Sequence, residues 1–218
     1  MLTKNLQILF QKVLSYRRRF RLNFILSKIN ICNSMNIIDI GCGIDGRSVD
    51  DHIPDNLKWK ITGIDILPES LIKHNYNNYK YIRQDAQYLN QFRDNEFDLA
   101  ISIGMLEHIP GEKSFKKVVS EIIRVAKQYA VVVPYRYCLI EPHFGVPFFP
   151  IFPYSIQLAL IRIFNLNKLR NVVMEDYNFV KNHYRWLTNK EYSTIFYGST
   201  VYLIPPFDVI AIIKKSPL

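Results

Sequence analysis

The chain has few cysteines, and those it has lack a structural spacing. Cys32, Cys42 and Cys138 are the only three, and no C-x-x-C pair occurs. This pattern excludes a disulfide framework and a cysteine zinc site, and it suits a reducing compartment. The 5 histidines also show no metal-ligand spacing. We therefore expect a cytoplasmic protein without a metal.

Long apolar runs are also missing. No stretch reaches the roughly 20 residues that a transmembrane helix requires. The apolar stretches near the start are short and no small-residue cleavage site follows them, which argues against a secretory signal. With 218 residues, the chain is long enough for one domain, or for one domain with an elaboration.

No acidic residue precedes Asp39, although the chain as a whole has a net charge of +9. Lysines and arginines alternate there with apolar residues at helical spacing, so residues 1–30 are predicted to form a basic amphipathic helix. Such a helix has three interpretations that the sequence leaves open. It can contact an anionic membrane, which would make the protein peripheral; it can be an organellar transit segment; or it can cap a cofactor site.

Glycine is scarce, with 8 in the chain, yet two lie close together after an apolar run. The segment reads Asn36-Ile-Ile-Asp39-Ile-Gly41-Cys42-Gly43, which indicates a buried parallel strand that turns sharply into a loop. Glycine allows positive φ and a close approach of the backbone to a ligand. A tight turn without any ligand is the alternative, because many turns contain two glycines.

Two further acids follow strand-like runs. Asp65 ends the segment 60–66, about 20 residues beyond the loop, where a doubly wound α/β fold places the carboxylate that binds ribose hydroxyls. Asp85 ends a third short strand, and a fourth strand, 97–103, leads through Gly104 into Leu106-Glu107-His108.

Together these segments resemble the class I S-adenosylmethionine-dependent methyltransferases, in particular the group acting on small molecules, lipids and sugars. The matching pieces are D-I-G-C-G at 39–43, G-I-D-I at 63–66, Q-D-A at 84–86 and F-D-L-A-I-S followed by L-E-H-I-P within 97–110. They occur in the order and spacing of the family over about residues 36–134. The resemblance implies S-adenosyl-L-methionine as cofactor, with these residues around it: Asp39, Gly41, Cys42, Gly43, Gly46, Asp65, Ile66, Asp85, Ala86, Ser102 and Ile103. Asp65 would accept the ribose hydroxyls and Asp85 the adenine amino group.

The glycine loop departs from the family at one position. Asp45 stands where the third glycine of G-x-G-x-G is usual, and Gly46 follows it. Asp tolerates left-handed backbone better than most residues, so the loop can close one residue later. The loop also fails to continue into G-x-x-G, which argues against a nicotinamide dinucleotide and a dehydrogenase.

Strands that alternate with helices predict a doubly wound, mostly parallel α/β sheet. The resemblance implies that this is the Rossmann-like methyltransferase fold, with seven strands and an antiparallel last strand inserted beside the fifth. The expected organisation is a core at 31–134, an elaboration at 135–182 and a closing part at 183–218. Strands are expected at 36–41, 60–66, 79–84, 97–103, 129–133, 199–203 and 207–214. Helices are expected at 69–75 after Pro68, at 114–128, at 155–164 and, from the capping box Thr188-x-x-Glu191, up to Phe196.

The elaboration is rich in proline and aromatic residues from Glu141 to Pro153 and then strongly apolar along 155–164. An apolar helix of this kind packs on several sides or meets an apolar partner. It can be a lid packed on its own domain, a wall for an apolar acceptor, or a shallow membrane contact.

The chemistry needs an acceptor atom aligned with the activated methyl group, and an oxygen acceptor benefits from a general base. Histidine is the usual base near neutral pH, and the candidates are His108, His143 and His183, with Glu141 placed to orient His143. For His108 the alternative is a structural role in the Leu-Glu-His turn.

We expect methyl transfer to a small, sugar-like or lipid-linked acceptor at oxygen. The alternatives are a non-catalytic cofactor-binding or scaffold protein, and an RNA methyltransferase. DNA is not expected as a substrate. RNA is disfavoured because the elaboration is apolar instead of basic. The N-P-P-Y-type tetrad that base-modifying methyltransferases have at the end of the fourth strand is also absent, and Ser102-Ile-Gly-Met stands there.

Overall fold

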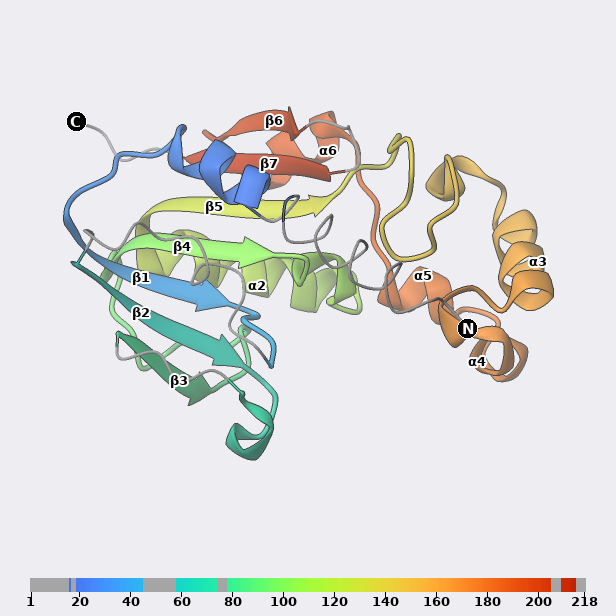
Figure 1. The fold of residues 1–218 in the computed structure, drawn as a ribbon, viewed down its shortest axis with the longest axis horizontal. Helices are drawn as coiled ribbons and strands as arrows, with labels where there is room; N and C mark the ends of the chain where they lie inside the picture. The colour runs from blue at the N-terminus through green and yellow to red at the C-terminus, as the bar shows by residue number, and fades with distance from the viewer. Residues whose placement is uncertain (1–15, 17–18, 45–57, 74–77, 205–208, 215–218) are drawn as a thin grey trace.

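The computed structural model of the chain describes residues 16, 19–44, 58–73, 78–204 and 209–214. Seven strands form one sheet in the order β3-β2-β1-β4-β5-β7-β6 (Figure 1). Their bounds are β1 Ser34–Ile40, β2 Lys58–Asp65, β3 Tyr79–Arg83, β4 Phe97–Ile103, β5 Ala126–Pro134, β6 Thr200–Ile204 and β7 Val209–Lys214. The first five strands pair in parallel, and β7 lies antiparallel between β5 and β6. The predicted fold class is confirmed, including the inserted antiparallel last strand.

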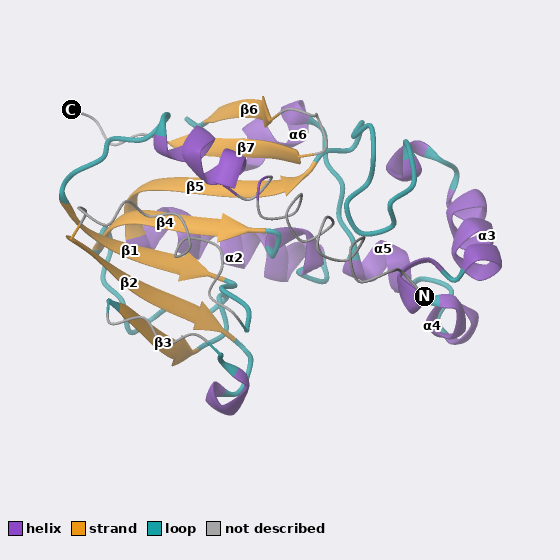
Figure 2. Cartoon of the chain, viewed as in Figure 1, coloured by secondary structure: helices purple, strands orange, loops and turns teal. Residues whose placement is uncertain are grey.

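Both faces of the sheet are covered, because apolar side chains alternate along its central strands. Ile38 and Ala100 point into one cluster with α2 (Glu112–Val125) and α6 (Asn189–Ile195). Ile37 and Leu99 point into the opposite cluster, with Ile25 and other residues of the N-terminal part. The described part of the predicted basic helix, 19–26, is helical and lies on this second face (Figure 2). The remainder of that helix lies outside the described residues.

The elaboration forms a separate small core beyond the carboxyl ends of β4 and β5 (Figure 1). Its elements are the 3-10 turns η4 Phe149–Ile151 and η5 Leu166–Lys168, and the helices α3 Tyr154–Phe164, α4 Arg170–Glu175 and α5 Phe179–His183. Phe144, Phe149, Leu158 and Ile161 are buried in this core. The opposite side of α3 remains exposed, with Ile163 at 65% and Phe164 at 66% exposure.

Two predicted helices differ from the structure. Within the described part of the expected helix 69–75, which ends at residue 73, only the 3-10 turn η2, Glu69–Leu71, is present, because no side chain caps it and Ile72 is already extended. Lys73 then donates its backbone N–H to the carbonyl oxygen of Ile44. The expected helix 114–128 begins at Glu112 and ends at Val125, and β5 starts directly at Ala126 because Lys127 and Gln128 pair with β4 and neighbouring segments.

Candidate active site

The glycine loop leaves β1 at the carboxyl edge of the sheet. Gly41 and Cys42 both donate their backbone N–H to the carbonyl oxygen of Ile64, which fastens the loop to β2. Gly41 has φ +76°, and a Cβ at this position would come within 2.3 Å of Met105 Cγ. Gly43 has φ +66°, but a Cβ there would meet nothing within 4 Å. The loop is therefore closed on the Met105 side and open at Gly43.

Asp65 is fixed beside this opening. One carboxylate oxygen accepts the backbone N–H of Gly43 at 2.9 Å, and the other accepts that of Leu67 at 3.2 Å. A carboxylate accepts about four hydrogen bonds, so Asp65 retains acceptor capacity for hydroxyls. A half-buried acid held by the loop itself, in front of open space, fits a ribose-bearing cofactor.

The other predicted cofactor residues line the same edge. Asp39 is completely buried and accepts a hydrogen bond from the Tyr79 hydroxyl at 3.4 Å, so it supports the loop from behind. Asp85 and Ala86 follow β3, and the Asp85 carboxylate accepts the backbone N–H of Gln87. Cys42 is buried, and burial raises the pKa of its thiol to about 12.

Three further predicted residues occupy different positions. Ser102 is the second-last residue of β4 and is buried, and its hydroxyl has no hydrogen-bond partner among the described residues. Ile103 follows it and is half-buried, whereas Ile66 is 66% exposed. Gly46, and Asp45 before it, lie outside the described residues.

The predicted histidines His108 and His143 meet at one point, although they are far apart in the sequence. Their rings form an edge-to-face pair with centroids 4.9 Å apart. His108 belongs to the 3-10 turn η3, Leu106–His108, after β4, and His143 belongs to the elaboration. His183 is not part of this pair, because its ring stacks on Phe179 and its Nδ1 lies 2.9 Å from the Phe179 carbonyl oxygen.

Glu141 holds His143 in place, which agrees with the orienting role considered above. Its Oε1 lies 2.6 Å from His143 Nδ1, and its Oε2 accepts the backbone N–H groups of His143 and Phe144. Trp186 Nε1 also donates to Oε1 at 3.1 Å. Glu141 is fully buried, so these four contacts replace water around its carboxylate.

The pattern of residues did not single out Glu107, which the structure brings to the same point. Its Oε1 lies 3.7 Å from His143 Nε2, and its side chain is buried. The backbone carbonyl of Glu107 accepts the N–H of Arg185, which joins η3 to the segment returning from the elaboration. Glu107 stands in the recognised L-E-H piece, and only its contact with His143 distinguishes it from a structural residue of the turn.

These titratable groups are shifted in different directions. Burial raises the pKa of Glu107 to about 7. Burial also lowers the pKa of His108. For His143, burial alone would lower the pKa, but the hydrogen bond to Glu141 and the charges of Glu141 and Glu107 outweigh it and raise the pKa. His143 is therefore the stronger base of the two histidines.

Aromatic rings surround the two histidines on the side of the elaboration. The Tyr184 ring lies edge-on to His108 and His143, at centroid distances of 5.2 and 5.1 Å. Tyr184 in turn stacks on Trp186. Arg21, on the helical segment 19–26, lies close enough for its charge to act on Glu107. The charge of this segment therefore acts on the site, and the cap interpretation of the N-terminal helix stays a prediction.

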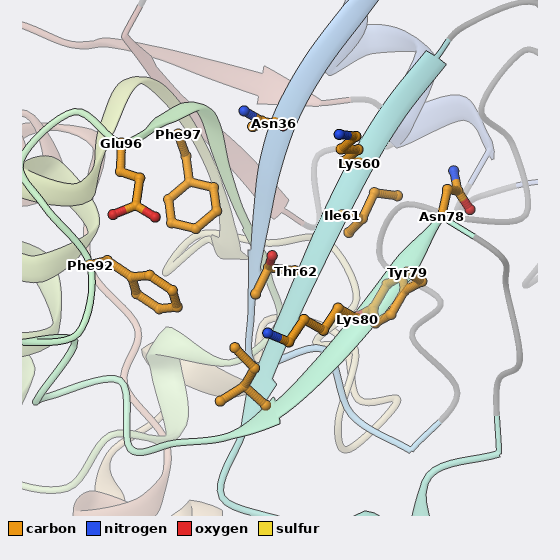
Figure 3. Close-up of a pocket in the computed structure, with 11 residues that line it drawn as sticks. Asn36, Lys60, Ile61, Thr62, Asn78, Tyr79, Lys80, Phe92, Glu96 and Phe97 are labelled. Carbon is orange, nitrogen blue, oxygen red and sulfur yellow. The ribbon is translucent and has the colours of Figure 1, made fainter.

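Two grooves lie elsewhere. One of about 530 Å³ is bordered by Phe92, Glu96 and Phe97 on one side and by Thr62 and Lys80 on the other (Figure 3). It follows the first halves of the strands, away from the glycine loop. The second, of about 740 Å³, runs between α2 and α6. Neither groove is lined by a predicted site residue.

Comparison with known proteins identifies the core. Residues 38–133 match the methyltransferase domain family. The sterol 4-C-methyltransferase strm-1 of Caenorhabditis elegans is 33% identical over 111 residues, which cover 47% of this chain and 31% of that protein. The chain thus spans about a third of the curated relative that it matches.

Solved structures share the fold over nearly the whole chain. A putative methyltransferase in complex with the Haloferax volcanii Trm112 methyltransferase activator superposes with a TM-score of 0.58 at 12% identity, covering 95% of this chain and 93% of that one. A methyltransferase from Aquifex aeolicus gives 0.53 at 15% identity, covering 90% and 89%. The resemblance to class I methyltransferases and the assignment of S-adenosylmethionine as cofactor are thereby confirmed for the domain. The subgroup and the roles of single site residues stay predictions.

Proposed function

We propose that this chain, whose residues 38–133 form a class I S-adenosylmethionine-dependent methyltransferase domain, is an enzyme that methylates a small, sugar-like or lipid-linked acceptor at oxygen. The observation that carries the proposal is the meeting of Glu107, His108 and His143 at the carboxyl edge of the sheet, beyond β4. A protein that only bound the cofactor would not need two histidines and two buried acids at that place.

The glycine loop and its acids would hold the cofactor. S-adenosylmethionine supplies a methyl group that is already activated on a sulfonium, so the chain has only to bind and align the acceptor. Asp65 is prepared for the ribose hydroxyls by its two backbone bonds. Asp85 and Ala86 stand at the end of β3, where the adenine is expected.

His143 would remove the proton of an acceptor hydroxyl. Glu141 Oε1 accepts a hydrogen bond from Nδ1–H, so Nε2 keeps its lone pair and is free to accept the proton. The same contact stabilises the positive charge that the ring then carries, in agreement with the raised pKa of His143. Neutral His108 and Tyr184 border the ring and fix its plane.

The acceptor class is supported by the wall of the site. Tyr184 and Trp186 are partly exposed there, and rings of this kind suit an apolar ligand or the apolar face of a sugar. The relative from Caenorhabditis elegans is named for a sterol substrate, which favours the lipid side of the proposal. Its name also specifies carbon as the methylated atom. Analysis of the methylated product therefore has to show whether the methyl group is on oxygen or on carbon.

We also propose peripheral contact of the elaboration with an anionic membrane. No helix among the described residues is long and apolar enough to cross a bilayer. Exposed apolar side chains do gather on the elaboration, among them Phe148, Ile151, Ile156, Ile163 and Phe164. A surface of this kind would hold the enzyme near a lipid-linked acceptor.

A radiolabelled methyl assay against lipid, glycan and RNA fractions tests the function. We expect label in the lipid or glycan fraction, with mass spectrometry placing it on oxygen. Replacing His143 by Ala should reduce kcat at least 100-fold and leave cofactor affinity within about threefold, because the ring of His143 contacts Glu141, His108 and Tyr184 instead of Gly41 or Gly43. Cofactor binding without transfer to any fraction would favour the non-catalytic alternative, and label in RNA would favour the RNA alternative.

A further inference from the structure

Glu107, His108 and His143 each present one ligand atom, and all three atoms lie within 4.8 Å of one another. We propose that this trio binds a divalent transition metal ion, with Zn²⁺ as the ion that its donors suit best. The inference rests on the proposed function, because it places the ion where the acceptor is expected. It departs from the expectation drawn from histidine spacing, since residues far apart in the chain form the trio.

Both imidazole rings have a hydrogen-bond acceptor at Nδ1, as metal-bound histidines usually do. His108 Nδ1 lies 3.0 Å from the His183 carbonyl oxygen, and His143 Nδ1 lies 2.6 Å from Glu141 Oε1. Each acceptor requires the proton to be on Nδ1, which leaves Nε2 deprotonated and available. A backbone carbonyl or a carboxylate behind the second ring nitrogen is the usual support of a metal-bound histidine.

Glu107 supplies an independent observation. Its side chain is only 2% exposed, and Oε2 has no hydrogen-bond partner among the described residues. Oε1 faces His143 Nε2 at 3.7 Å, which is longer than a hydrogen bond. A buried carboxylate oxygen without a partner is costly, and a cation between Glu107 and the two rings would satisfy it.

The supporting groups are rigid. Glu141 receives four hydrogen bonds and is itself outside the trio, so it can orient His143 without competing for the ion. The Arg185 N–H bonded to the Glu107 carbonyl fixes the turn that carries the other two ligands. The ligand atoms need to approach by only about 1 Å to reach zinc bond lengths of about 2.0–2.2 Å.

The donor set indicates both the ion and its task. Two imidazole nitrogens and one carboxylate oxygen are a known set of zinc ligands in catalytic sites, where a coordination position stays open. An acceptor hydroxyl that occupied this position would lose its proton to solvent more readily, because the cation favours the alkoxide. His143 would then be a ligand, and it would act as the proton acceptor only in the metal-free chain.

Metal titration tests the inference without relying on activity. The full chain, stripped with a chelator, is titrated with Co²⁺ by absorption and with Zn²⁺ by competition. We expect one equivalent bound at micromolar concentration or tighter. Glu107→Gln and His143→Ala should each weaken binding at least 100-fold, and Glu141→Gln should weaken it 10- to 100-fold. Retained S-adenosylmethionine binding and circular dichroism verify that each variant is folded.

Two control variants exclude adventitious ligands. Cys32→Ser removes the exposed thiol, and His183→Gln removes a ring whose Nδ1 lies against the Phe179 carbonyl while keeping the backbone carbonyl that orients His108. Both should bind the ion like the unmodified chain. A thiolate-to-cobalt charge-transfer band, binding lost in Cys32→Ser, binding unchanged in Glu107→Gln, or no stoichiometric binding would each overturn the inference.

The outcomes also separate this inference from the function on which it rests. Methyl transfer by a chain that binds no metal would overturn the metal site and leave the methyltransferase activity intact. Stoichiometric metal binding at the trio, with no methyl transfer to any acceptor fraction, would support the site and overturn the proposed reaction.

Discussion

Asp65 has a structural role as well as the proposed binding role. The carboxylate that would bind the ribose also accepts the backbone N–H of Gly43. Asp65→Ala should weaken S-adenosylmethionine binding at least tenfold, since each hydrogen bond to a charged group contributes about 1.5–3 kcal/mol. Calorimetry measures this change. The matched control is Asp98→Asn, because Asp98 bonds Asn36 and Lys127 at the opposite end of β4 and should leave affinity unchanged. Equal losses in both variants would mean that Asp65 acts through folding alone.

Gly41→Ala and Gly43→Ala should differ in their effects on stability and on cofactor affinity. Gly43→Ala should fold with a cost of about 1–2 kcal/mol for its positive φ and lose cofactor affinity at least tenfold, because the added methyl group enters the open side of the loop. Gly41→Ala should be the less stable variant, since its methyl group would collide with Met105. Thermal unfolding and calorimetry separate the two effects. Normal affinity in Gly43→Ala would show that the cofactor does not approach that side.

At the scale of elements, Glu121 ties α2 to the segment before β4. It is 3% exposed, accepts the Leu89 N–H, and forms an ion pair with Arg124, whose hydrogen bond is the main cause of its lowered pKa. A lowered folded-state pKa contributes stability above the unfolded value, near 4.5, and this contribution disappears as pH falls through the folded value. Glu121→Gln should therefore destabilise the chain by about 2 kcal/mol at pH 7, with a difference that shrinks below pH 4.5.

Urea unfolding at neutral and acid pH checks this prediction. Glu112→Gln is the control, because Glu112 is largely exposed and its pairs with Lys116 and Arg185 are on the surface. It should change stability little at either pH. A Glu121 effect that stays constant down to acid pH would assign the loss to packing instead of charge.

The same scale shows what sequence patterns can specify. Thr188 and Glu191 form the predicted capping box, with hydrogen bonds in both directions, because that signal is complete within four consecutive residues. The predicted helix after Pro68 had no such local signal and remained a single turn. Glu107 could not be singled out from the sequence, because its contact with His143 depends on the position of the elaboration. No local sequence pattern specifies that position. The ends of consecutive strands could be placed at one sheet edge from the sequence, and the cofactor roles of the residues there stay predictions. The acceptor side depends on contacts between distant segments.

For the whole molecule, the membrane proposal rests on the exposed apolar side chains of the elaboration and on the net charge of +9. Sedimentation with anionic vesicles should increase with anionic lipid and decrease with salt. The double change Ile163→Glu and Phe164→Glu should reduce binding at least tenfold, since burying each such side chain contributes about 1.5–3 kcal/mol. Tyr197→Glu, an exposed aromatic residue after α6, is the control and should bind normally. A chain that stays in the supernatant at low salt would contradict membrane contact.

The isolated β-bridge between Tyr135 and Leu187 affects how the sequence of this protein can change in evolution. These two residues pair directly, and Arg136 also donates its N–H to the Leu187 carbonyl, so the chain leaves the core and returns to it at neighbouring points. Insertions and replacements between neighbouring attachment points leave the strand order untouched. Recombination between these points would replace the elaboration as a unit, and it would remove His143 and Glu141 together. The core would keep Glu107 and His108. A replacement segment would therefore have to supply a residue that contacts these two side chains in place of His143.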